Sequence, residues 1–364
     1  MEPLWDGARW PDTPQSLSYW HMDTAGLWEP QSGYFNTASY GLPPLAGTDA
    51  MDAALSDWRV GRTSFETWES SVTASRECFA RLVNVPYSDV AIGAAVSEQF
   101  GLVATALPDR AKVVVPEGEF TSVVFPWAVH ADRGVEVITA PVAKLAEAID
   151  ASTTLVAFSL VQSASGELAP FDDILAAARH HGALIAVDGT QSCGWLPFDA
   201  SAVDALAAHT YKWMMSPRGA SLLVLRPELR ERMRPHAAGW FAGENPHTSY
   251  YGLPLRLATD ARRFDTSPAW FSWVGTQPAL EVIEKLGVEN IRDHDVRLAN
   301  RLREGLELEP SNSAIVSVDI DDAERKLERA GIRAGIRAGR IRLSCHVYTT
   351  DHDVDDVLTT LTAP

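Results

Sequence analysis

Six short apolar runs between residues 90 and 226 constrain the fold of this chain most. They are VAIG (90–93), KVVVP (112–116), VEVITA (135–140), TLVAFSL (154–160), ALIAVDG (183–189) and ASLLVLR (220–226). Short, nearly continuous apolar runs are typical of strands buried on both faces of a sheet. Between two of them, PFDDILAAARHHG (170–182) has early acids, a late His and Gly, and helical apolar spacing. The alternation predicts an α/β fold with a mostly parallel sheet between helices.

After about residue 250 the pattern changes. Residues 279–307 have a helical pattern, AIVSVDI (314–320) and RIRLS (340–344) are strand-like, and a helical segment, DDAERKLERAG, lies between them. We therefore expect a large domain over residues 30–250. A smaller α+β domain is expected to combine residues 1–29 with residues 251–364.

Charge and cysteine content exclude several classes of function. Lys and Arg total 31 against 48 Asp and Glu, and a net charge of -17 disfavours binding to nucleic acid or to an anionic membrane surface. The three cysteines, Cys78, Cys193 and Cys345, fit neither a disulfide framework nor a zinc site, so no metal is expected. The N-terminus does not resemble a signal peptide, and no apolar run is long enough to span a membrane. We expect a cytoplasmic protein with small-molecule ligands.

Only one of the five lysines has an apolar and aromatic setting. Lys212 lies in HTYKWMMSPRG, directly before a predicted buried strand, whereas the others open a strand or lie in amphipathic or charged segments. Desolvation favours the neutral, nucleophilic amine. The alternative is an aliphatic stem that covers the core while the amine reaches water.

Asp188 ends a predicted strand 24 residues before Lys212 (212 − 188). Ligands of open α/β sheets bind at the carboxyl ends of strands, so this acid faces the expected crevice. A carboxylate there can pair with a protonated pyridine nitrogen, and Gln191 can donate a hydrogen bond to a ring oxygen. The alternative for Asp188 is a helix N-cap. Together with Lys212, Asp188 predicts pyridoxal 5'-phosphate (PLP), carried as a Schiff base on Lys212.

Residues 185–226, from IAVDGTQ to LLVLR, resemble the cofactor segment of class V, fold-type I PLP enzymes. This group contains cysteine desulfurases, isopenicillin-epimerase-like proteins and related lyases and transaminases. Acid, glutamine and lysine occur in the family's order, with His209 three residues before the lysine and a Pro-x-Gly element after it. The resemblance implies a large PLP-binding domain around a seven-stranded type of sheet, and adds His209 to the cofactor site.

Three further segments resemble the family's cofactor contacts. AAVSEQFGLVA (94–104) is similar to the helix start that holds the phosphate, here through Val96 and Ser97. In EGEFTSVVFPW (117–127), Phe120 takes the place of the histidine that stacks on the ring in desulfurases. In VQSASGELAP (161–170), Ser163 stands where many relatives have an asparagine. The alternatives are a helix-capping Ser97 and a core Phe120.

The resemblance also implies substrate contacts and a partner subunit. YFNTASYGLPP (34–44) is similar to the family's N-terminal segment near the substrate, which suggests Asn36 and Tyr40. RLSCHVYTTDHDVDDVL (342–358) is similar to the C-terminal pattern in which Arg342 would bind the substrate carboxylate, unless it forms a structural ion pair. RRFDTSPAW (262–270) resembles a turn whose hydroxyl, here Ser267, reaches the phosphate of the neighbouring subunit in a homodimer. The alternative is a simple Ser-Pro turn.

The implied chemistry begins with an L-α-amino acid that forms an external aldimine, from which Lys212 takes the Cα proton. Desulfurases carry a catalytic cysteine before the substrate arginine, but GIRAGIRAGR (331–340) contains none. We therefore expect β-elimination from a cysteine-type substrate, as in a C–S lyase, with transamination or epimerisation as alternatives. A binding protein without catalysis is disfavoured by the set of retained residues. Residues 239–265 could form a lid, a pocket wall or a dimer interface.

Overall fold

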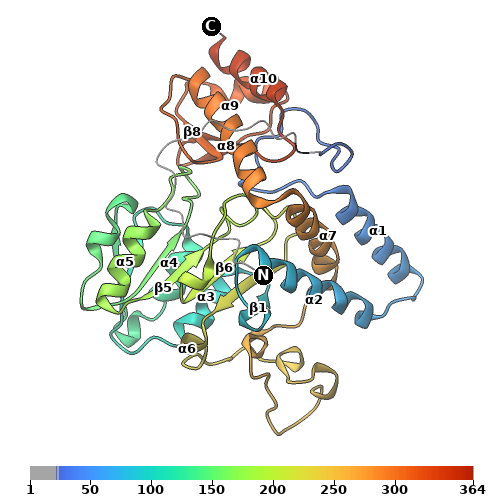
Figure 1. The fold of residues 1–364 in the computed structure, drawn as a ribbon, viewed down its shortest axis with the longest axis vertical. Helices are drawn as coiled ribbons and strands as arrows, with labels where there is room; N and C mark the ends of the chain where they lie inside the picture. The colour runs from blue at the N-terminus through green and yellow to red at the C-terminus, as the bar shows by residue number, and fades with distance from the viewer. Residues whose placement is uncertain (1–21, 23, 364) are drawn as a thin grey trace.

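The computed structural model describes residue 22 and residues 24–363, and its centre is a seven-stranded sheet (Figure 1). The strands follow the order β1-β7-β6-β5-β4-β2-β3. They are β1 (Val90–Gly93), β2 (Lys112–Pro116), β3 (Glu136–Ala140), β4 (Thr153–Ser159), β5 (Leu184–Asp188), β6 (Ala205–His209) and β7 (Ser221–Leu225). The pairs from β3 to β6 are parallel, and only β7 runs against its two neighbours. The predicted mostly parallel sheet is confirmed.

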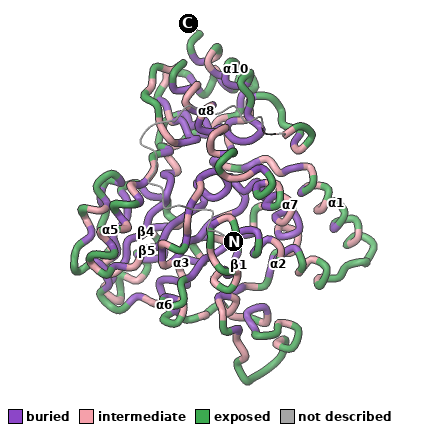
Figure 2. The backbone as a smooth tube through the Cα atoms, in the orientation of Figure 1, coloured by how far each residue is buried: buried purple, intermediate pink, exposed green. Residues whose placement is uncertain are grey.

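Helices cover both faces of the sheet because successive strand residues point to opposite sides. One buried cluster joins Val187 and Leu222 to α2 (Phe65–Leu82), α5 (Phe171–His181) and α7 (Trp270–Leu286). The other joins Ala186 and Leu223 to α3 (Val96–Ala104) and α4 (Thr121–Ala128). Figure 2 shows the strands as a buried centre between more exposed helices. The remaining helices of this part are α1 (Leu45–Arg59), which packs on α7, and the short α6 (Pro227–Arg230).

A second sheet forms the smaller α+β part predicted near the C-terminus. It is antiparallel, in the order β8-β10-β9, and packs with three helices at the top of Figure 1. Its elements are β8 (Ile315–Val318), β9 (Gly335–Arg337), β10 (Arg340–Ser344), α8 (Val288–Gly305), α9 (Ala323–Arg329) and α10 (Asp351–Thr362). β9 and β10 are joined by Ala338 and Gly339, both at positive φ as in a tight hairpin turn.

The division into domains near residue 250 stays a prediction. α7 follows that point and packs against α1 and α2, beside the large sheet. Of residues 1–29, which we expect to join the small domain, 1–21 and 23 lie outside the described residues. The N-terminal run that argues against a signal peptide lies there too. Among the described residues, no helix is both long and apolar enough to cross a membrane.

Residues 34–41 connect the small sheet to the large one. The backbone of Phe35 bonds to Arg333 and Ser344 of the smaller part, and the next turn brings Gly41 N to Tyr211 O at 2.9 Å. A Cβ atom on Gly41 would lie 1.9 Å from Lys212 O, so only glycine fits at this contact. The segment therefore holds the chain around Lys212 close to β10.

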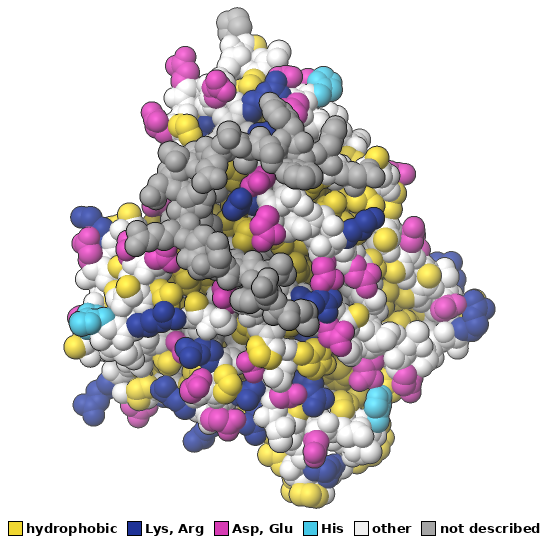
Figure 3. Space-filling model, viewed as in Figure 1, with side chains coloured by type: hydrophobic (Ala, Val, Ile, Leu, Met, Phe, Trp, Pro, Cys, Tyr) yellow, Lys and Arg dark blue, Asp and Glu magenta, His cyan; other side chains and the backbone are white. Residues whose placement is uncertain are grey.

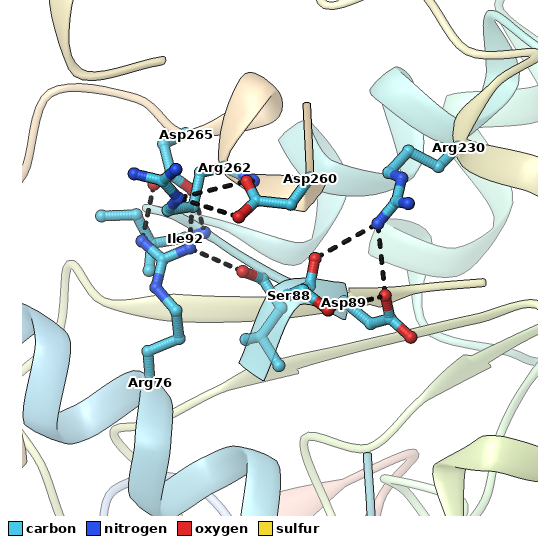
Figure 4. Close-up of polar contacts among 9 residues, drawn as sticks. Arg76, Ser88, Asp89, Ile92, Arg230, Asp260, Arg262 and Asp265 are labelled. Carbon is cyan, nitrogen blue, oxygen red and sulfur yellow. Dashed lines mark hydrogen bonds and ion pairs between the residues drawn. The ribbon is translucent and has the colours of Figure 1, made fainter. Parts of the chain in front are cut away.

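A buried ion pair ties α2 to β1 and to the segment before α7 (Figure 4). Arg76 Nη2 lies 2.6 Å from Asp265 Oδ2, and Arg76 Nη1 donates to Val90 O at 2.6 Å. Asp265 Oδ1 also accepts from Ile92 N at 2.8 Å. Removing one partner of such a pair costs about 3–5 kcal/mol, because the other charge stays buried. The pair fixes the backbone two residues before Ser267.

Candidate active site

A cavity of about 220 Å³ opens at the carboxyl end of the large sheet. Loops that follow β1, β2, β4, β5 and β6 line it together with the residues before β7, as expected for a ligand site of an open α/β sheet. Seven of the residues predicted for the site line this cavity: Ser97, Phe120, Ser163, Asp188, Gln191, His209 and Lys212. The other five, Asn36, Tyr40, Val96, Ser267 and Arg342, do not line it.

Lys212 is buried, with 8% of its surface exposed. Its amine lies 5.6 Å from the centre of the Phe120 ring and 5.9 Å from that of Tyr211. Burial lowers the pKa of Lys212 to about 8, while Asp188 acts in the opposite direction. The alternative of an amine that reaches bulk water is wrong, and a large fraction of this amine is neutral near pH 8.

Asp188 ends β5 beside Ser159 of β4. Its Oδ1 accepts a hydrogen bond from Thr190 N at 2.8 Å, and burial raises the pKa of Asp188 to about 6. The side chain of Thr190 also hydrogen-bonds to this carboxylate and, like the backbone bond, lowers its pKa against the effect of burial. A buried carboxylate that lines a cavity fits the protonated ring nitrogen of PLP. It caps no α-helix, because a helix does not follow β5 directly.

Gln191 is fixed by three hydrogen bonds. Its Nε2 donates to Ala38 O at 3.0 Å and to Ser163 Oγ at 3.1 Å, while Oε1 accepts from Trp213 Nε1 at 2.8 Å. Both amide hydrogens are engaged in this arrangement. Donation to a ring oxygen would therefore replace the bond to Ser163.

The N-terminus of α3 lies at one end of the cavity, where Ala95 provides no side-chain cap. Val96 N donates to His209 Nε2 at 3.3 Å, and the pKa of His209 is lowered to about 4 by burial, so this imidazole is neutral. Its buried Nδ1 has no partner among the residues that the structure describes. Ser97 follows Val96 and lines the cavity. An uncapped helix start with a hydroxyl beside it fits an anion such as a phosphate.

Phe120 is half-exposed, at 49%, so the alternative of a core phenylalanine is wrong. The preceding residue, Glu119, is a buried carboxylate that the sequence did not single out. It accepts hydrogen bonds from Phe120 N at 2.7 Å, from Ser159 N and Oγ at 2.8 Å each, and from Gln162 Nε2 at 3.0 Å. Glu119 therefore joins the backbone of Phe120 to the end of β4 and the following loop.

Arg342 lies on β10 and reaches the cavity through Ser163. Its Nη1 donates to Ser163 O at 2.5 Å, and its Nη2 donates to Ser39 Oγ at 2.7 Å. No carboxylate among the described residues pairs with it, so a structural ion pair is not found. The buried Oδ1 of Asn36 has no partner either, and it lies beside Gly335, opposite Arg342 in the sheet.

Tyr40 and Ser267 lie outside this group. Tyr40 is exposed at the surface, its ring centre 5.3 Å from that of Tyr211, and its hydroxyl accepts from Arg218 N at 3.2 Å. Ser267 is exposed and makes no hydrogen bond within the described residues. No residue from 239–265 lines the cavity.

A buried network behind Lys212 was also not predicted. His346 Nδ1 lies 2.8 Å from Asp295 Oδ2, and His346 Nε2 donates to Trp213 O at 3.0 Å. Because a carbonyl can only accept, the second ring nitrogen and the carboxylate share one proton. The indole of Trp213 in turn bonds to Gln191. His346 stands in the quoted run RLSCHVY, but nothing in that run indicates Asp295 as its partner.

The described residues contain no group of three or more His, Cys, Asp or Glu that could hold a metal ion. What they bring together is an amine of lowered pKa, a buried carboxylate, an exposed aromatic ring and a helix start. These groups fit PLP.

The lowered pKa of Lys212 predicts a pH dependence of its reactivity. In cofactor-free protein, trace acetylation of Lys212 should rise with a midpoint near pH 8, because only the neutral amine reacts. Asp188→Asn removes a charge that favours the protonated amine, so the midpoint should fall. Peptide mass spectrometry between pH 6 and 11 measures both. A wild-type midpoint near 10.4, the value of a solvated lysine, would contradict the burial argument.

Known proteins similar to this chain agree with the fold. The chain is 30% identical over 320 residues to the uncharacterized aminotransferase YcbU of Bacillus subtilis (strain 168), covering 80% of this chain and 85% of that protein. It is 26% identical over 339 residues to isopenicillin N epimerase of Streptomyces clavuligerus, covering 79% and 83%.

Solved structures with the same fold include the cystine C–S lyase C-DES in complex with its reaction product, cysteine persulfide. The TM-score is 0.81 at 23% identity, over 91% of this chain and 97% of that one. The apo cysteine desulfurase of Thermococcus onnurineus NA1 gives 0.78 at 23% identity, over 90% and 93%. At this identity the likeness establishes fold type I and no more.

The family model for aminotransferase class V matches residues 59–357, which is most of the chain. This range contains both sheets and every cavity residue. The chain therefore belongs to the aminotransferase class-V family of PLP-dependent enzymes.

Proposed function

We propose that this enzyme catalyses β-elimination from a cysteine-type L-α-amino acid, as a C–S lyase. The observation that carries the proposal is a cavity with one buried amine of lowered pKa and no thiol among the described residues that line it. Cys78, Cys193 and Cys345 are buried and free, and burial raises the pKa of Cys78 and Cys193 to about 12. Such thiols are poor nucleophiles, which argues against persulfide transfer. Free cysteines also support a cytoplasmic location.

The residues of the cavity divide between the cofactor and the substrate. When bound, PLP supplies an electron sink that stabilises negative charge at the substrate Cα. Asp188 would hold the ring nitrogen, Phe120 the ring face, and Ser97 with the backbone at Val96 the phosphate. Further contacts are proposed for Ser163, Gln191 and His209 with the cofactor, and for Asn36 and Tyr40 with the substrate.

Proton transfer is assigned to Lys212. Its neutral amine takes the Cα proton and returns a proton to the sulfur that leaves from Cβ, so the enzyme ends the step in its starting protonation state. Arg342 orients the substrate by binding the α-carboxylate with two parallel hydrogen bonds. Phe120 has no proton to exchange, so it cannot share this role with Lys212 as a histidine at its position could.

Transamination is the second candidate, since the relative YcbU is named as an aminotransferase. Both reactions begin with removal of the Cα proton. In β-elimination the substrate releases its sulfur group, whereas in transamination it transfers its amino group to the cofactor. Epimerisation would release neither.

The test is incubation of the pure holoenzyme with S-substituted L-cysteines and no keto acid. β-Elimination predicts equimolar pyruvate and ammonia. Lys212→Ala should lower the rate of their formation about 10²–10⁴-fold, the range for loss of general acid–base catalysis. Lys285→Ala, at an exposed lysine, is the matched control, and its rate should equal that of the wild type. Conversion of the cofactor to its amine form without pyruvate would instead identify an aminotransferase.

The enzyme is further proposed to be a homodimer in which Ser267 serves the neighbouring site. Ser267 is exposed and does not line the cavity of its own chain, and the buried Arg76–Asp265 pair fixes the backbone beside it. The projection at the bottom of Figure 1 lies within residues 239–265 and carries hydrophobic side chains at its end in Figure 3. Tyr251, Leu253 and Leu255 are exposed there, which suits a subunit interface.

Mixed dimers test this arrangement. Ser267→Ala should weaken cofactor affinity about 10-fold, the effect of one charge-assisted hydrogen bond. In dimers of one Lys212→Ala subunit and one Ser267→Ala subunit, a residue acting across the interface predicts one restored site of wild-type affinity. No restoration, or a monomer by light scattering, would contradict the proposal.

A further inference from the structure

Three arginines without carboxylate partners surround Lys212. The charges of Arg218, Arg337 and Arg342 all act on its amine, and Asp188 is the one acid that opposes them appreciably. Within the described part of the chain, none of the three forms an ion pair. The other arginines of this acidic protein commonly do, as Arg76, Arg297 and Arg301 illustrate. Arg218 lines the cavity and Arg342 reaches it through Ser163, and uncompensated cations beside a ligand cavity indicate anionic groups on the ligands.

Arg337 and Arg342 share a single hydroxyl group. Arg342 Nη2 donates to Ser39 Oγ at 2.7 Å, and Arg337 Nη2 donates to the same oxygen at 3.0 Å. The two guanidinium groups are therefore neighbours that repel each other. Burial lowers the pKa of Arg342 to about 9, and the charge of Arg337 adds to the effect. An anion near Ser39 would relieve this repulsion.

The β9–β10 hairpin places these arginines on one side of the small sheet. Arg342 pairs with Gly335, and Arg337 pairs with Arg340, so alternation brings Arg337 and Arg342 to the same face. A Cβ atom at Gly335 would lie 3.4 Å from Arg342 Nη2 and 2.9 Å from Asn36 Oδ1. Glycine at 335 therefore leaves room for the Asn36 side chain beside Arg342, while Arg337 lies two residues further along β9 and is partly exposed.

The proposed reaction provides two anions for the three arginines. The α-carboxylate occupies Arg342, which is linked to the cavity through Ser163. The phosphate is proposed to lie at the start of α3, and Arg218 is the arginine that lines the same cavity, 4.9 Å from the centre of the Tyr211 ring. Arg337 is left with Ser39 and its own strand's Ile336 O as partners.

We propose that Arg337 binds a second acidic group, carried on the side chain of the substrate. The preferred substrates would be L-cysteine conjugates whose sulfur substituent ends in a carboxylate. The identity of the substrate as a cysteine conjugate rests on the proposed function. The presence of a second anionic group rests on Arg337 itself. Ser39 holds the guanidinium in place, and a planar fork suits a carboxylate.

The test compares ligands that differ in charge and little else. L-2-aminoadipate and its side-chain amide match S-carboxymethyl-L-cysteine and S-carbamoylmethyl-L-cysteine, with a methylene in place of sulfur, so they bind without elimination. Their dissociation constants follow from the change in cofactor absorbance of the holoenzyme. The wild type should prefer the acid about 10- to 100-fold, the range of a charge-assisted hydrogen bond. The same preference is expected in kcat/KM for the two cysteine conjugates.

Arg337→Gln should weaken binding of the acid about 10-fold or more and should change the dissociation constant of the amide less than about threefold. Arg337→Lys keeps a positive charge and should retain part of the preference. Arg340→Gln is the matched control. Arg340 pairs with Arg337 across the same hairpin, but it is exposed and bonds to Ser317. It should behave as the wild type.

Two results would overturn the proposal. The wild type could bind acid and amide equally, or Arg337→Gln could weaken both equally, which would mean that Arg337 assists Arg342 with the α-carboxylate. Failure of the proposed function gives a different result, because absence of pyruvate with an intact, Arg337-dependent preference leaves the second anion site standing.

Discussion

The burial of the Lys212 amine within reach of the Asp188 charge is the interaction on which the site depends. A shift of the lysine pKa from its ordinary value to about 8 corresponds to roughly 3 kcal/mol of lost stabilisation of the ammonium form. The charge of Asp188 opposes this loss, and burial raises the pKa of Asp188 itself to about 6. Burial therefore disfavours the charged form of both groups. Asp188 remains able to interact with the cationic nitrogen of the cofactor, and Lys212 with its reactive carbon.

The rest of the structure keeps these two groups in place. Asp188 is fixed by the parallel sheet, whose register sets it beside Ser159 and above the Glu119 carboxylate network. Lys212 follows β6, and its chain is held from the other side by Gly41 and by the carbonyl of Trp213, which accepts from His346. The small sheet, through β10 and residues 34–41, thus completes the cavity that the large sheet begins.

Much of this arrangement is predictable from local sequence. Each of the six apolar runs forms a strand, but β6 was not predicted, because Ala205–His209 contains no β-branched residue. The helix expected over residues 279–307 is interrupted at Gly287, whose φ of 82° ends α7 before α8 begins. Glu119 and the His346–Asp295 pair could not be predicted, since their partners lie 40 or more residues away in sequence and only the fold brings them together. Seven of the predicted residues do meet at one cavity, because strand ends of a parallel sheet share an edge.

The most direct test of the account is to locate the lysine that carries the cofactor. Borohydride reduction of the PLP-loaded protein fixes the cofactor covalently to that lysine, and peptide mass mapping then identifies it. The account predicts one modified site, Lys212, and no modification of the Lys212→Ala variant under the same conditions. Modification of Lys112, Lys144, Lys285 or Lys326 instead, or of no lysine at all, would contradict it.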